Sequence, residues 1–198
     1  MATLHLYAAN LERLEGLLFG ADPAKSRYGD PEKLIDHLLN ESVLERARAG
    51  TSEFDPEVAE RALRELVAGP RPESPPGRLH ALVLHGIVET LCAHLGDSAF
   101  GPTTIHALGD FGAKWERVLG PGLADSLTNR RLPFVQFSDE VSSPFFSYWM
   151  HDEIKGFLRK LPEAQKAPAG DGEALHRLHE AWTNLLGQGP DAILVGIV

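Results

Sequence analysis

Cysteine and long apolar runs are scarce in this chain. Its 198 residues include a single cysteine, Cys92, which excludes an internal disulfide and is typical of a protein from a reducing compartment. No apolar run approaches the roughly 18 residues needed to span a bilayer. The opening residues, MATLHLYAANLERL, lack the basic and long apolar regions of a signal peptide. We therefore expect a soluble cytoplasmic protein that does not associate with membranes.

Basic residues are also few. The chain has 19 lysines and arginines against 28 aspartates and glutamates, which gives a formal net charge of −9, and the acids are spread along its length. A surface of this charge is repelled by phosphate backbones and by anionic lipids. The composition argues against nucleic acid as a partner and favours a protein partner with a basic surface.

Motifs for catalysis and cofactor binding are missing or misplaced. Gly96-Asp97-Ser98 is similar to the opening of one class of serine esterases, but we expect it to follow a helix, and Phe100 stands where a second glycine is needed. Residues 187–192 match a GxGxxA string, yet we expect them after a helix and before a strand, the reverse of a dinucleotide site. We predict no cofactor, and the sequence favours a protein that is not an enzyme.

Two histidines are candidate ligands of a metal ion. His176 and His179 are three residues apart on an expected helix and could share one metal ion. They also flank the apolar stripe of that helix, where half-buried histidines are common, and the chain has no HExxH motif. We predict no metal site.

Apolar segments at the two ends predict strands. Residues 3–8 alternate apolar and polar side chains, and residues 191–198 form a nearly continuous apolar run. An apolar terminus outside a sheet would fray and aggregate. We therefore expect the two end segments to pair with each other.

Capping residues and apolar stripes predict helices between these strands. Asp30-Pro31 and Asp55-Pro56 each place a carboxylate cap before a proline, a strong helix start. The predicted helices are 10–20 with Asn10 as its cap, 31–50, 56–69, a central and most apolar helix 79–95, 114–119, 123–127, 151–161 and 173–186. Residues 70–77 hold four prolines and are predicted to be an exposed linker.

The stretch 133–161 holds about half of the aromatic residues of the chain. A strand is predicted over 145–149, so the adjacent Phe145 and Phe146 should point to opposite faces of a sheet. Packing in the core explains most of these aromatics. The alternative is a binding surface formed by Phe145, Tyr148 and Trp149, followed by His151 and Asp152 at the start of the next helix.

Several of these segments resemble the YfbM-like family, a bacterial family of unknown function, and its actinobacterial and myxobacterial relatives. The segments are residues 4–8 (LHLYA), 89–96 (ETLCAHLG), 146–154 (FSYWMHDEI), 175–182 (LHRLHEAW) and 192–197 (AILVGI). The resemblance implies a mostly helical α+β domain with a small sheet, and it implies no reaction. The family tends to place Ser or Thr where Met150 stands, so we expect a weaker helix cap there or one supplied by another residue.

We thus predict a helix-rich α+β fold in which residues 1–198 form a single domain. The N- and C-terminal strands, with one or two inner strands, should form a small sheet. The predicted function is that of a non-enzymatic binding or interaction protein, immunity-like or regulatory. The alternative is an enzyme or small-ligand-binding protein with a site around His151, Asp152 and His176.

Overall fold

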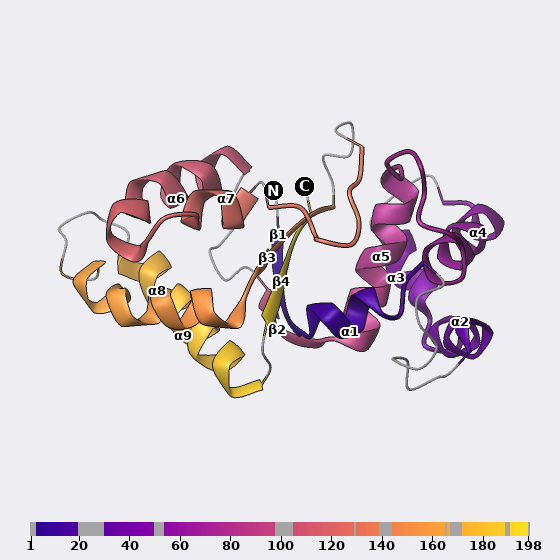
Figure 1. Ribbon diagram of the computed structural model, residues 1–198, viewed down its shortest axis with the longest axis horizontal. Helices are drawn as coiled ribbons and strands as arrows, with labels where there is room; N and C mark the ends of the chain where they lie inside the picture. The colour runs from indigo at the N-terminus through magenta and orange to yellow at the C-terminus, as the bar shows by residue number, and fades with distance from the viewer. Residues whose placement is uncertain are drawn as a thin grey trace. The chain divides into compact units, whose positions relative to one another are not determined.

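The computed structural model describes residues 3–19, 30–49, 54–97, 105–128, 130–138, 144–164, 166, 172–188 and 191–197. The chain divides into two compact units (Figure 1). Unit 1 comprises Met1–Ala9, Ala93–Leu132 and Phe145–Val198, and unit 2 comprises Asn10–Cys92 and Pro133–Pro144. Most of unit 2 therefore lies in the sequence between the first two strands of unit 1. The single domain over 1–198 stays a prediction.

The elements of unit 1 are β1 (Thr3–Ala9), β2 (Ala93–Asp97), α6 (Ile105–Leu119), α7 (Leu123–Thr128), β3 (Phe145–Trp149), α8 (His151–Ala164), α9 (Gly172–Gln188) and β4 (Asp191–Ile197). The helices of unit 2 are α1 (Leu11–Glu15), α2 (Pro31–Asn40), α3 (Val43–Ala49), α4 (Pro56–Val67) and α5 (Arg78–Leu91). This content confirms the helix-rich α+β class.

Unit 1 contains an antiparallel sheet of four strands in the order β2–β1–β4–β3. The two end strands of the chain are its central pair, in register from Thr3 opposite Ile197 to Ala9 opposite Asp191. β3 pairs with the free side of β4, and β2 pairs with the free side of β1 across an irregular register. The predicted sheet of terminal strands with two inner strands is confirmed.

Helices α6 to α9 pack on one face of this sheet (Figure 1). The core between them is aromatic. Trp149 of β3 meets Trp182 of α9 edge to face with ring centroids 5.6 Å apart, and Phe157 of α8 stacks on Trp182 at 5.1 Å. The remaining apolar residues of this core include Leu6, Leu119, Leu123, Leu127, Leu161, Leu178 and Leu185. Apolar residues at helical spacing bury one side of each helix here, as the sequence predicts.

The first turn of α8 obtains its caps from residues other than Met150. Glu153 accepts a hydrogen bond from the backbone N–H of Met150 at 2.9 Å, the reciprocal half of a capping box. The N–H of His151 donates to Asp191 Oδ1 at 3.1 Å, which ties α8 to the start of β4. The expected shift of the cap away from Met150 is confirmed.

Both Asp-Pro helix starts in unit 2 are confirmed. Asp30 accepts from the N–H of Glu32 at 3.0 Å, and Asp55 accepts from the N–H of Glu57 at 2.9 Å. α5 is the central helix of this unit, with residues 81–88 all buried. A Cβ on Gly86 would stand 2.7 Å from the carbonyl oxygen of Val43, so glycine is what allows α3 to approach α5 this closely.

Two helices of unit 2 end earlier than predicted. The helix expected over 31–50 is two helices, because Glu41 and Ser42 break it and Ser42 adopts a left-handed backbone with φ 59°. Serine and asparagine compete with helical hydrogen bonds through their side chains, which favours a turn here. The helix capped by Asn10 ends at Glu15, and the predicted end at Gly20 lies outside the described residues.

The prediction of a helix over 79–95 is wrong at its C-terminal end. α5 ends at Leu91, Cys92 has an extended backbone, and β2 follows. Pairing with β1 and a contact between the rings of His94 and Tyr7, 5.0 Å apart, favour the strand. Gly96 and Asp97 therefore lie in a strand and not after a helix, and Ser98 lies outside the described residues.

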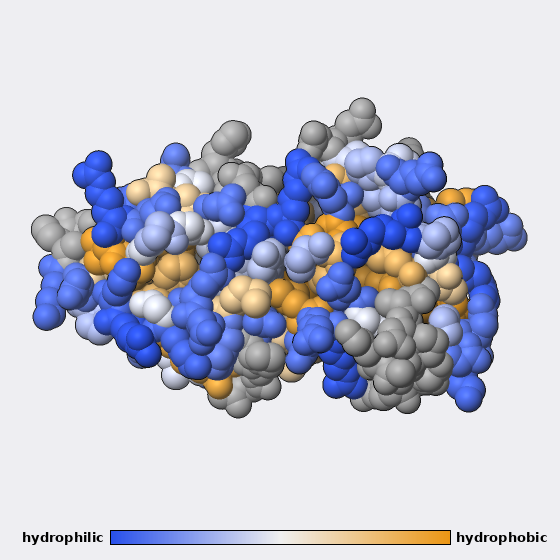
Figure 2. Space-filling view, in the orientation of Figure 1, coloured by the Kyte–Doolittle hydropathy of each residue, from blue (hydrophilic) through white to orange (hydrophobic). Residues whose placement is uncertain are grey.

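The predicted linker over 70–77 joins α4 to α5 within unit 2. Its residues are exposed as expected, except Pro76, which is buried. No helix in the described part of the chain combines the length and apolar character that crossing a membrane requires. Figure 2 shows hydrophilic side chains over most of the visible face, in keeping with 24% charged residues.

Candidate functional site

The loop between α4 and α5 begins where glycine and proline stop a helix. Gly69 follows the last turn of α4, and a Cβ there would stand 2.5 Å from the carbonyl oxygen of Glu65. The four prolines that follow have no N–H to donate and disfavour helix. Residues 70–77 therefore cross irregularly to Gly77, the N-cap position of α5. We call residues 69–77 the proline strap.

Two contacts hold the strap to other parts of unit 2. Arg71 forms an ion pair with Glu15 at 3.1 Å. The carbonyl oxygen of Pro76 accepts a hydrogen bond from the N–H of Ser138 at 3.1 Å. These anchors, with the fixed φ of each proline, limit the conformations that the strap can adopt.

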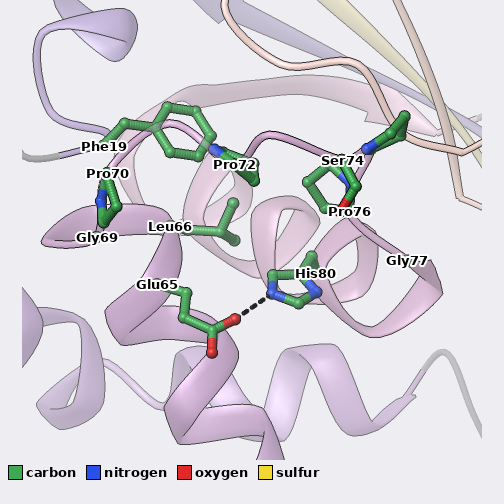
Figure 3. A pocket seen from close by; sticks show the side chains of 11 residues that line it. Phe19, Glu65, Leu66, Gly69, Pro70, Pro72, Ser74, Pro76, Gly77 and His80 are labelled. Atoms are coloured by element: carbon green, nitrogen blue, oxygen red, sulfur yellow. Dashed lines mark hydrogen bonds and ion pairs between the residues drawn. The ribbon is translucent and has the colours of Figure 1, made fainter.

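A hollow of about 410 Å³ lies beneath the strap (Figure 3). Its lining comes from the turn after α1, the end of α4, the strap and the start of α5. The lining residues are Phe19, Glu65, Leu66, Gly69, Pro70, Pro72, Ser74, Pro75, Pro76, Gly77 and His80. Most of these present carbon to the hollow, and the volume falls in the range of small-molecule sites, roughly 300 to 1,000 Å³.

Phe19 reaches the hollow through an uncommon backbone conformation. Its φ is 57°, in the left-handed region that aromatic residues rarely occupy. Its N–H donates to the carbonyl oxygen of Leu66 at 2.6 Å, which fixes the residue against the end of α4. Strain of this kind, worth about 1 to 3 kcal/mol, tends to persist at functional sites. The conformation sets the ring beside the hollow (Figure 3).

One hydrogen-bonded pair supplies the polar edge of the hollow. His80 Nε2, in the first turn of α5, lies 2.7 Å from Glu65 Oε2, in the last turns of α4 (Figure 3). The His80 side chain is 26% exposed and the Glu65 side chain 55% exposed. Ser74 adds a hydroxyl from the strap. The site therefore combines an apolar lining with a carboxylate, an imidazole and a hydroxyl.

Among the described residues, no group of three or more His, Cys, Asp or Glu side chains is arranged to hold a metal ion. Cys92 follows α5 and is half-buried. Burial raises the pKa of its thiol to about 12, although the charge of Arg13 acts in the opposite direction. Because the thiolate is the nucleophile, this thiol is not activated for chemistry at neutral pH.

The aromatic residues predicted as a binding surface lie in β3 of unit 1. Trp149 is 0% exposed, and its Nε1 donates to Ser126 Oγ at 2.8 Å. Phe145 is half-buried against the core, and Phe146 is buried. Tyr148 is half-buried under the guanidinium of Arg130, 5.0 Å from its ring centroid. Trp149 thus lies in the core, whereas a binding role for Phe145 and Tyr148 stays a prediction.

The predicted polar site residues differ in their exposure and are not brought together at the hollow. Asp152 is 93% exposed, and His176 is 64% exposed beside Glu180 at 3.6 Å. His151 is half-buried, and its Nδ1 is buried with no hydrogen-bond partner. His179 is also exposed. None of the four lines the hollow beneath the proline strap.

The sequence favoured a solvated or core-edge position for His80 over a place in a functional cleft, and it gave no sign of the other residues that line the hollow. The four prolines mark the strap, but they were interpreted only as a linker. Phe19 lies far from the strap in sequence, and nothing in its neighbours predicts the left-handed backbone that brings it there. Glu65 and His80 sit one on each side of the strap. Their positions could have predicted that the two side chains lie close together, because a short loop brings the end of one helix near the start of the next.

Comparison of the chain with family models, curated proteins and solved structures finds no match.

Proposed function

We propose that this chain is a non-enzymatic binding protein and that its ligand occupies the hollow beneath the proline strap. The observation that carries the proposal is the hollow itself, about 410 Å³ in volume, apolar over most of its lining and polar at one edge. Small-molecule sites are typically concave and apolar, with a few polar groups that orient the ligand.

Two features of the lining support a site prepared for a ligand. The strap is anchored by Arg71 and Pro76, so the entropic cost of ordering it on binding is reduced. Phe19 is held in a left-handed conformation that sets its side chain in the lining of the hollow. A preformed apolar wall of this kind favours binding without a large rearrangement.

A regulatory or immunity-like role is the wider context that we propose for this binding. The net charge of −9 supports a partner with a basic surface. The family resemblance stays a prediction from its motifs and adds no activity. The alternative site around His151, Asp152 and His176 has less support, because two of these side chains are exposed and none lines the hollow.

The experiment is a fragment screen against the ¹⁵N-labelled full chain by NMR. We expect the fragments that bind to shift the amide signals of Leu66, Gly69, Ser74, Gly77 and His80. Ser74→Trp, which adds bulk to an exposed strap residue at the hollow, should abolish these shifts. Gly156→Ala, in α8 of unit 1, is the control and should leave them unchanged.

The binding proposal is lost if bound fragments shift amides elsewhere and leave those of the hollow untouched. It is also lost if Ser74→Trp binds the same fragments as the natural sequence. The circular dichroism spectrum and Tm of each variant establish that it is folded before binding is compared.

A further inference from the structure

The contact between Glu65 and His80 determines which ring nitrogen of His80 donates a hydrogen bond and which accepts one. A carboxylate can only accept hydrogen bonds, so Glu65 Oε2, 2.7 Å from His80 Nε2, requires a proton on that nitrogen. In the neutral imidazole the proton on Nε2 leaves Nδ1 with a lone pair. Glu65 thereby makes Nδ1 of His80 a hydrogen-bond acceptor.

Nδ1 is the second ring nitrogen of a residue that lines the hollow. Glu65 is the one hydrogen-bonding partner of His80 among the described residues, and it engages Nε2. Like Nδ1 of His80, the Ser74 hydroxyl has no hydrogen-bonding partner within the described part of the chain. A ligand that fills the hollow would shield Nδ1 from water, and a buried acceptor without a donor costs free energy. A ligand with a donor removes that cost.

The charge of the hollow selects against anions. Glu65 and His80 are the titratable residues of its lining, and with a neutral imidazole their sum is one negative charge. The nearest strap cation, Arg71, is already paired with Glu15 at 3.1 Å. A carboxylate or phosphate on the ligand would meet the charge of Glu65, and the described lining contains no lysine or arginine to offset it.

The apolar walls suit a flat ring. Proline ring hydrogens next to the amide nitrogen carry partial positive charge and pack well on the negative face of an aromatic ring. The walls here combine Pro70, Pro72, Pro75 and Pro76 with Phe19, whose ring offers an edge or a face to another ring.

From these points, and resting on the proposed function, we infer that the ligand is a small neutral or cationic aromatic molecule with an N–H or O–H donor. The donor bonds to Nδ1 of His80, and the ring packs between Phe19 and the prolines of the strap. Glu65 is a positioning residue, because it acts by fixing the tautomer of His80.

Indole, 1-methylindole and indole-3-carboxylate test this inference as matched probes titrated into the full chain by NMR. Indole keeps the donor, 1-methylindole lacks it, and the carboxylate adds an anion to the ring of indole. We expect indole to bind about tenfold more tightly than 1-methylindole, the ratio for one hydrogen bond near 1.4 kcal/mol. Indole-3-carboxylate should bind more weakly than indole.

Three variants locate the effect. His80→Phe keeps a ring but removes the acceptor, so the indole to 1-methylindole ratio should fall to about one while 1-methylindole still binds. His176→Phe makes the same change at an exposed histidine outside the hollow and should keep the tenfold ratio. In Glu65→Gln the amide can donate as well as accept, so the ratio should fall between these two values.

The tautomer itself can be measured without a ligand, from the ¹⁵N chemical shifts of the His80 ring. We expect a protonated Nε2 and an unprotonated Nδ1, and a mixture of tautomers in Glu65→Gln.

A proton on Nδ1 in the natural sequence overturns the inference. So does an equal affinity for indole and 1-methylindole with both bound at the hollow, although the binding function then stands. If none of the three probes binds the hollow while other fragments do, the ligand class is wrong. If nothing binds there, the proposed function fails with it.

Discussion

Ser126 is the residue on which the polar contacts inside unit 1 converge. Its side chain is completely buried in α7, accepts a hydrogen bond from Trp149 Nε1 at 2.8 Å and donates to the carbonyl oxygen of Leu123 at 2.9 Å. Its own carbonyl oxygen accepts from the Ser147 hydroxyl. Buried polar groups of this kind stabilise a structure only while each of them has a partner.

Ser126→Ala should lower the free energy of unfolding by about 1 to 3 kcal/mol, because it leaves Trp149 Nε1 buried without an acceptor. Chemical denaturation measures the loss. Trp149→Phe and the double variant complete a cycle, in which we expect a coupling of about 1 kcal/mol. Additive effects of the two single changes would show that the hydrogen bond contributes nothing.

Glu153 is the second residue whose role is testable. Burial alone would raise the pKa of its carboxyl group, but hydrogen bonds from Arg130 and from the Met150 amide lower it below the ordinary value of 4.5. A carboxyl group with a lowered folded-state pKa stabilises the protein above its unfolded-state pKa. This contribution is lost as the pH falls through the folded-state value.

Glu153→Gln should therefore cost about 1 kcal/mol at pH 7 and progressively less as the pH is lowered from about 5 to 3. Unfolding curves recorded across this range for both proteins measure the difference. Asp152→Asn, one residue earlier and 93% exposed, is the control and should shift stability little at any pH. A constant difference between Glu153→Gln and the natural sequence at all pH values would contradict this account.

At the scale of elements, three glycines on helices differ in the space around them: two are crowded by a neighbouring helix, and one is open. A Cβ on Gly86 of α5 would stand 2.7 Å from the backbone of α3, and one on Gly112 of α6 would stand 2.5 Å from Ala124 of α7. A Cβ on Gly156 of α8 would meet nothing within 4 Å. The first two glycines permit close helix packing, and the third only adds flexibility to the unfolded chain.

Gly156→Ala should raise the free energy of unfolding by about 0.5 to 1 kcal/mol. Gly86→Ala and Gly112→Ala should lower it by about 1 to 3 kcal/mol, because neighbouring backbone must move. Thermal and denaturant unfolding of the three variants check this ordering. Stabilisation by either of the buried changes would mean that the helix contact is looser than described.

For the whole molecule, the sequence predicts what depends on neighbouring residues. Asp30 and Asp55 predict the starts of their helices, because a cap side chain bonds to backbone amides only two or three residues away. The apolar ends of the chain predict their pairing because such segments need a partner. The switch from α5 to β2 was not predictable in this way, since the contact of His94 with Tyr7 is between segments far apart in sequence.

The candidate site was still less accessible to prediction. The hollow exists because the turn at Phe19, the proline strap and two helix ends converge, and no local pattern encodes that convergence. The aromatic stretch over 145–149 drew attention by composition; Trp149 is buried in the core, and Phe145 and Tyr148 are half-buried. The composition of the chain drew attention to the aromatic residues of β3. It gave no sign of the residues that line the hollow beneath the proline strap.

The sheet order predicts how protection from hydrogen exchange is distributed. β1 and β4 have a partner on both sides, whereas β2 and β3 each have a partner on one side. Amides in the central pair should exchange more slowly than those of β2, whose register with β1 is irregular. Exchange followed by NMR or mass spectrometry checks this, and equal protection of β1 and β2 would contradict it.

The same strand order has a consequence for biosynthesis. β4 lies between β1 and β3, yet the ribosome makes it after every other described element. Until it emerges, β1 and β3 have no strand to join them, whereas α1 to α5 are complete much earlier. Nascent chains should thus acquire the helices of unit 2 first and close the sheet of unit 1 only after β4 has emerged. A stalled or prematurely terminated chain would expose the edge of β1, a surface for chaperones to protect.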